Sequence, residues 1–213
     1  MKRANLRWLA LAAKRFAAWM FEELKHVFVE PKPNLPEDEI PIDKSGRPDM
    51  SFYTEPLQHY IDLYGSFLDS SGTSREQHLA WKQRVHATWG LLAKGQEALP
   101  FLLILVQNAN PAAREDASFL LGELKSDSAI SEHLLAHLGN EKDLVVLSAM
   151  IDALGKLRYR PAIPALARLI LDPEIDLDTR WNAAFSLGAI AGQDFSGPDK
   201  LQKAESWIAS NKR

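Results

Sequence analysis

The sequence predicts an all-α protein in which about four helical hairpins stack into an α-solenoid with an N-terminal helical extension. Three observations predict this fold. First, three glycines follow one another at intervals of 33 residues, namely Gly122, Gly155 and Gly188. Second, an Ala-Leu or Ala-Ile pair recurs at intervals of 31 and 33 residues, beginning at Ala98, Ala129 and Ala162. Third, each repeat contains two apolar stripes with helical spacing, and a single hairpin of this kind buries only one side of itself, so neighbours must stack.

The two stripes of each repeat are separated by a short polar link, which indicates a helical hairpin. The stripes of the first halves are Ala117, Leu120, Leu121 and Leu124, then Ala149, Ala153, Leu154 and Leu157, then Ala183, Leu187 and Ile190. Those of the second halves are Ala129, Ile130, Leu134, Leu135 and Leu138, then Ala162, Ile163, Leu166, Leu169 and Ile170. We expect these side chains to form the core, with the smallest residues where helices approach most closely.

The repeats also carry a pattern of single residues. It reads Arg-x-x-Ala-x-x-x-Leu-Gly-x-Leu followed by Ala-Ile-Pro-x-Leu, and it is clearest over residues 153–157 and 161–166. This pattern resembles the HEAT-like repeats of bacterial proteins, the class also found in phycobilisome lyases, over roughly residues 80–195. Two positions depart from it, because Leu147 replaces the usual Arg and Leu92 stands where the other repeats have Gly. The resemblance implies a fold more than a role, since such repeats serve many functions.

Residues 1–30 are predicted to form an amphipathic helix that runs from about Ala4 to Val29. Its first half is basic and aromatic. The candidate interface residues are Arg7, Trp8, Lys14, Arg15 and Trp19. Three roles are open: packing on the repeats or on a partner helix, contact with an anionic membrane surface, and targeting. The apolar run between Arg7 and Lys14 is only six residues long, too short for a membrane span.

Other segments flank the repeats. Residues 31–52 contain five prolines among acidic residues, which predicts an extended linker. Residues 53–80 are expected to form N-terminal cap helices, the first beginning near Thr54, and Thr73 or Ser74 is expected to cap a long helix that ends near Ala93. The HEAT-like repeats then occupy residues 81–195, and residues 196–213 form a C-terminal capping helix, because an array needs a polar end.

Composition excludes several classes of function. The chain has 213 residues and a net charge of −3, which disfavours a dedicated nucleic-acid binder. It has no cysteine, so it has no disulfide, thiolate metal site or cysteine nucleophile. We expect a cytoplasmic protein, with peripheral membrane contact through the first helix as an alternative.

Few residues suggest chemistry. His133 and His137 are four residues apart on one predicted helix and form a weak candidate for a metal site, because two imidazoles are not a complete ligand set. No phosphate-binding or nucleophile motif is present. Carboxylates cluster at residues 37–39, at residues 115–116 and at residues 172–178, and we expect the last group to lie at a helix N-terminus. We therefore predict no enzyme activity, no cofactor and no small-molecule substrate.

The function that these observations favour is a non-catalytic protein–protein interaction scaffold, or an accessory subunit of a larger complex. Its partner would bind the repeat surface and the N-terminal helix. The alternatives are a bilin-lyase-like enzyme accessory, which the family resemblance implies, and a peripheral membrane adaptor. The candidate partner-binding residues form a basic ridge with one aromatic ring at the turn of the third repeat, namely Arg158, Tyr159, Arg160 and Arg168.

Overall fold

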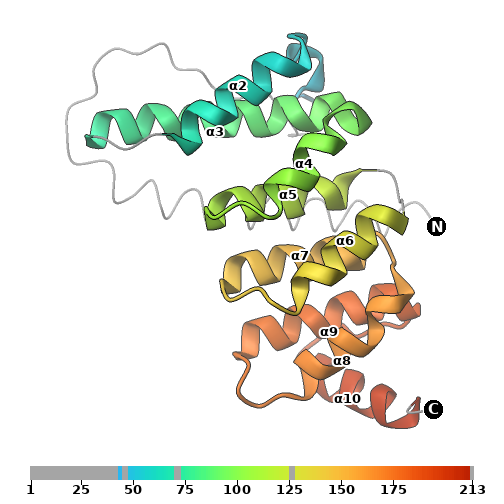
Figure 1. Ribbon diagram of the computed structural model, residues 1–213. Helices are drawn as coiled ribbons and strands as arrows, with labels where there is room; N and C mark the ends of the chain where they lie inside the picture. Colours follow the sequence, from blue (N-terminus) through green and yellow to red (C-terminus); the bar gives the residue numbers. More distant parts are fainter. Residues whose placement is uncertain (1–42, 45–47, 70–72, 125–127, 212–213) are drawn as a thin grey trace. The chain divides into compact units, whose positions relative to one another are not determined.

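The computed structural model describes residues 43–44, 48–69, 73–124 and 128–211, which are helical wherever they have regular secondary structure (Figure 1). The chain divides into two compact units, Met1–Phe52 and Tyr53–Arg213. In the first unit, the described part contains the short 3-10 helix η1 (Met50–Phe52). The predicted helix over residues 4–29, with its five candidate interface residues Arg7, Trp8, Lys14, Arg15 and Trp19, lies outside the described residues, as does most of the Pro-rich stretch.

The second unit begins with two long helices that pack against each other, α2 (Leu57–Leu68) and α3 (Ser74–Lys94). Helix α3 starts where the sequence predicts, because Thr73 and Glu76 cap it reciprocally. The Glu76 carboxylate accepts from the Thr73 N–H at 2.7 Å, and the Thr73 hydroxyl accepts from the Glu76 N–H. Pro56 precedes α2 rather than lying within its first turn, so this helix begins three residues later than expected.

Seven further α-helices and two short 3-10 helices follow in the described part of the chain. Their bounds are η2 (Gly95–Ala98) and α4 (Leu99–Leu105), α5 (Pro111–Glu123) and α6 (Ser128–Leu138), α7 (Leu144–Lys156) with η3 (Arg160–Ala162) and α8 (Ile163–Leu171), and α9 (Leu177–Ala191) with α10 (Lys200–Ser210). Contacts run in succession from α3 to α5, from α5 to α7 and from α7 to α9, and Figure 1 shows these helices side by side.

The 33-residue interval of the sequence is the interval between helix starts. Helices α5, α7 and α9 begin at Pro111, Leu144 and Leu177. The residue before each start caps the helix with a side-chain oxygen that accepts a backbone N–H: Asn110 accepts from Ala112, Asp143 from Val145 and Val146, and Asp176 from Thr179. A carboxylate or amide recurring every 33 residues therefore sets where these helices begin.

The core consists largely of the predicted stripes. All the leucines and isoleucines of the first-half stripes are buried, as are Ile130, Leu134, Leu138, Leu166 and Ile170 from the second halves. Ala129 is an error of the prediction, because it is exposed. It is the second residue of α6, and it lies about 100° around the helix from Ile130, which faces the core. Leu135, Ile163 and Leu169 are half-buried at the margin of the core.

Small residues lie where the successive helices approach most closely, as predicted. A Cβ added to Gly122 would lie 2.9 Å from the Cβ of Ala153 on α7, and one added to Gly155 would lie 2.8 Å from the Cβ of Ser186 on α9. Atoms do not pack at these distances, so a glycine at each position allows the helix pair its spacing. The contact repeats with the same 31-residue separation, from 122 to 153 and from 155 to 186.

Over the described ranges, no helix combines the length and the apolar character needed to cross a bilayer.

Candidate functional site

The predicted basic ridge begins at the turn that ends α7. The N–H of Tyr159 donates to the carbonyl of Leu154 at 3.2 Å, and that of Arg158 donates to Gly155 at 3.1 Å. These two bonds form a Schellman motif, which requires a left-handed residue at the position of Arg158. Arg158 has φ of 52° and is the one non-glycine residue with positive φ among those described. Glycine usually takes this position, so an arginine here costs about 1 kcal/mol of backbone strain.

The side chains of this turn differ in their surroundings. Arg158 and Arg160 are exposed, whereas the ring of Tyr159 is half-buried and packs against the hydrophobic core. The ring therefore anchors the turn from inside and leaves the two guanidinium groups on either side of it. Arg168 is exposed on α8, about two helical turns further along the chain. Within the described part of the chain, these three arginines form no ion pair, so their charges are directed to solvent.

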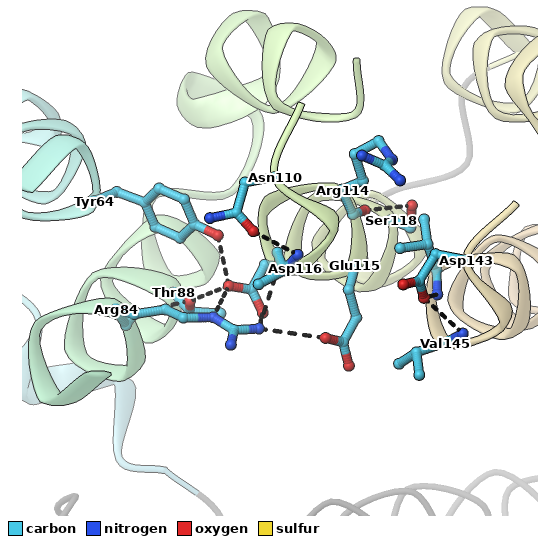
Figure 2. A network of polar contacts seen from close by, with 12 residues as sticks. Tyr64, Arg84, Thr88, Asn110, Arg114, Glu115, Asp116, Ser118, Asp143 and Val145 are labelled. Atoms are coloured by element: carbon cyan, nitrogen blue, oxygen red, sulfur yellow. Dashed lines mark hydrogen bonds and ion pairs between the residues drawn. The ribbon is translucent and has the colours of Figure 1, made fainter. Parts of the chain in front are cut away.

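A second polar cluster, which sequence reasoning did not identify, is buried between α2, α3 and α5 (Figure 2). At its centre the carboxylate of Asp116 is 7 % exposed. It accepts from the Tyr64 hydroxyl at 2.6 Å, and from Nε and Nη2 of Arg84 at 2.6 and 2.8 Å. Thr88 contributes a longer contact of 3.4 Å to the same carboxylate. Glu115 lies at 3.4 Å from Nη2 of Arg84, at the margin of this network.

The electrostatics of this buried network fix its protonation. Burial, and then the charge of Asp116, raise the pKa of Tyr64 far above its ordinary value, so the hydroxyl stays protonated and donates. Burial by itself works to lower the pKa of Arg84, but the hydrogen bonds and charge of Asp116 outweigh it and raise that pKa. Burial also raises the pKa of Glu115. Tyr64 and Arg84 therefore both stay protonated at neutral pH and donate to Asp116, so the network links α2, α3 and α5.

The arginines of the repeat pattern share this bracing role. Arg114 donates to both carboxylate oxygens of Glu141, with Nε at 2.7 Å and Nη2 at 2.9 Å. Arg180 donates to the carbonyl of Ile170 at 2.9 Å and to Glu205 at 3.2 Å. The arginine at the start of the repeat pattern was therefore the feature of the sequence that could have indicated these polar contacts. It did not indicate which residues accept the hydrogen bonds. Leu147 takes the equivalent position in the third repeat and is buried.

The predicted histidine pair is half-buried on α6. The rings of His133 and His137 stand edge to face with centroids 4.7 Å apart, and Nε2 of His133 is 3.2 Å from the side-chain amide nitrogen of Gln107. Burial, followed by the neighbouring His133, lowers the pKa of His137. In the residues that the structure describes, no third histidine or carboxylate joins them into a group able to hold a metal ion. The structure therefore brings together two ligands and no complete site.

Comparison with protein-family models, with curated proteins and with solved structures yielded no match for this chain.

Proposed function

We propose that this protein is a non-catalytic interaction module, an accessory subunit of a larger complex, built as an α-solenoid of HEAT-like hairpins. The 33-residue interval between helix starts supports the repeat architecture. The contacts from α3 through α5 and α7 to α9 support it as well, because each of these helices packs against the next one in the series.

The observation that carries the proposal is the turn Arg158-Tyr159-Arg160. It places two exposed guanidinium groups beside a ring that is anchored in the core, at the cost of a left-handed arginine. Strain at an exposed residue points to a role outside folding. A planar guanidinium and a rigid ring lose little entropy on binding, so they suit the centre of a protein interface. Arginines that form no ion pair with any of the described residues favour a partner surface that contains carboxylates.

The test is the triple variant Arg158→Ala/Tyr159→Ala/Arg160→Ala. Partners captured from native cytosol and membranes by the wild-type protein are identified by mass spectrometry, and the affinity of the dominant partner is then measured with both purified proteins. We expect the variant to bind about tenfold more weakly, or about 1.4 kcal/mol. A matched control, Lys142→Ala/Lys203→Ala, removes two exposed basic residues elsewhere and should bind normally. Equal affinity of the triple variant and the wild type would contradict the proposal.

A further inference from the structure

A second surface of the protein combines exposed apolar side chains with carboxylates. Eight large apolar side chains are exposed in the described ranges, and half of them belong to the neighbouring ends of α7, α8 and α9. These four residues, here named the apolar edge, are Leu144, Val145, Leu171 and Leu177. Their exposed fractions are 53, 53, 43 and 48 %. Apolar side chains stabilise a fold only when they are buried, and these four are not. Exposed apolar residues that are grouped in this way are typical of an interaction surface.

Two hydrogen bonds hold the helix ends that carry the apolar edge beside one another. The side-chain amide of Asn182 on α9 donates to the carbonyl of Ser148 on α7 at 3.1 Å, about one helical turn inside Leu144 and Leu177. These two leucines are the first residues of helices that pack side by side, so their Cα atoms are separated by roughly the 10 Å between packed helices. Arg180 donates to the carbonyl of Ile170, which fixes the end of α8, and with it Leu171, beside α9.

The charge beside the apolar edge is negative. The connection from α8 to α9 contains exposed Asp172, Glu174 and Asp176, and exposed Asp178 follows in the first turn of α9, with no basic residue between them. Asp176 caps α9, and Asp172 accepts from the N–H of Glu174 at 2.9 Å. The carboxylates of Glu174 and Asp178 form no ion pair within the described part of the chain. Lys142 and Arg168 are the exposed cations that flank the surface, so four carboxylates face two basic groups.

From this arrangement we propose that the apolar edge docks a basic amphipathic helix of a partner protein. An amphipathic helix presents apolar residues at i, i+3, i+4 and i+7, which would cover the leucines. Lysine or arginine residues flanking that stripe would lie against Glu174 and Asp178 and make the association faster and dependent on salt. This surface is at the start of α7, whereas the Arg158 turn is at its end, about 20 Å away. Arg168 belongs to the basic ridge and also flanks this surface, but no variant proposed for either surface replaces it, so the two proposals can fail separately.

The probe is a fluorescein-labelled synthetic helix of about 18 residues made only of Leu and Lys, with leucines at the amphipathic spacing. Its binding to the purified full chain is measured by fluorescence anisotropy at low and high salt. A matched helix carries Glu in place of Lys. We expect saturable binding of the Leu/Lys helix, weakened by salt, and binding of the Leu/Glu helix that is at least about tenfold weaker.

Variants distinguish this surface from general attraction to a negative protein. Leu144→Ser/Leu177→Ser should weaken binding about tenfold, and Glu174→Gln/Asp178→Asn should weaken it and flatten its dependence on salt. The control Leu79→Ser/Ile104→Ser removes two exposed apolar residues on α3 and α4, with exposed fractions of 52 and 68 %, and should bind as the wild type does. Unchanged binding in the leucine variant, an equal loss in the control, or no binding of the Leu/Lys helix to the wild type would overturn the proposal.

Discussion

Replacing Asp116 with Asn tests whether the buried network holds α2, α3 and α5 together. The substitution keeps the shape of the side chain and removes its charge. It leaves the guanidinium of Arg84, whose side chain is 12 % exposed, without a carboxylate closer than Glu115 at 3.4 Å. Asp116 accepts three short hydrogen bonds through its two oxygens. The asparagine side chain has only one oxygen, so it can still accept the bonds made to that oxygen. Its NH₂ group cannot accept, so the bond from the donor that faces it is lost.

The expected loss of unfolding free energy is about 3 to 5 kcal/mol, the usual cost of removing one partner from a buried ion pair. This cost exceeds that of an ordinary hydrogen bond, about 1 kcal/mol, because Arg84 retains its charge in a site that excludes water. A typical domain is stable by only about 5 to 15 kcal/mol. Asp116→Asn should therefore unfold at a clearly lower urea concentration, measured by circular dichroism at 222 nm.

The double variant Arg84→Met/Asp116→Leu separates the charge effect from simple loss of packing. It removes both charges together, so we expect it to be less destabilised than Asp116→Asn. The three variants and the wild type form a double-mutant cycle whose coupling energy measures the pair. If Asp116→Asn unfolds with the wild type, or if the double variant loses the sum of the single losses, the bracing role assigned to this network is wrong.

Two further predictions concern the packing and the pH response. Gly155→Ala should lower the free energy of unfolding by about 1 to 3 kcal/mol, measured with urea, because its Cβ would lie 2.6 Å from the Oγ of Ser186. Gly65→Ala, with open space around it, should raise the free energy of unfolding by up to about 1 kcal/mol. Equal effects of the two substitutions would contradict the close approach at Gly155. The hydrogen bonds from Arg114 lower the pKa of Glu141 from 4.5 to about 2. The ion pair therefore stabilises the folded state by about 1 to 2 kcal/mol after solvent screening, fully above pH 4.5 and progressively less as the pH falls towards 2. In acid unfolding, the difference in stability between the wild type and Glu141→Gln should close over that pH range.

The all-helical fold was predictable because its signals are local and repeated. The apolar stripes have helical spacing, and Thr73 with Glu76 forms a capping box that the sequence shows directly. The caps at Asn110, Asp143 and Asp176 were equally visible, with 33-residue spacing, but they were not read as a set. Ala129 was misplaced because a recurring Ala-Ile pair does not show which of its members faces the core.

The polar network was not predictable because it joins residues far apart in the chain. Asp116 meets Arg84 across 32 residues and Tyr64 across 52. Glu115 and Asp116 together resemble the other acidic clusters of the sequence. No neighbouring residue in the sequence distinguishes a buried aspartate from an exposed one. The turn at Arg158 was predicted as a turn, but its left-handed residue was not, because glycine is the residue that normally marks that conformation.

The outermost glycines of the helix succession have aromatic neighbours. Gly122 and Gly155 each face a small residue of the next helix, but Gly90 on α3 faces the ring of Tyr60, and Gly188 on α9 faces Phe195 and the carbonyl of Gln193. At both positions an aromatic ring of the same chain covers the glycine, and at Gly90 that ring comes from α2, which packs against α3. The small-residue contact that joins α5 to α7 and α7 to α9 is therefore replaced by an aromatic contact at Gly90 and at Gly188, so the end helices of the succession are spaced by rings rather than by direct approach of their backbones.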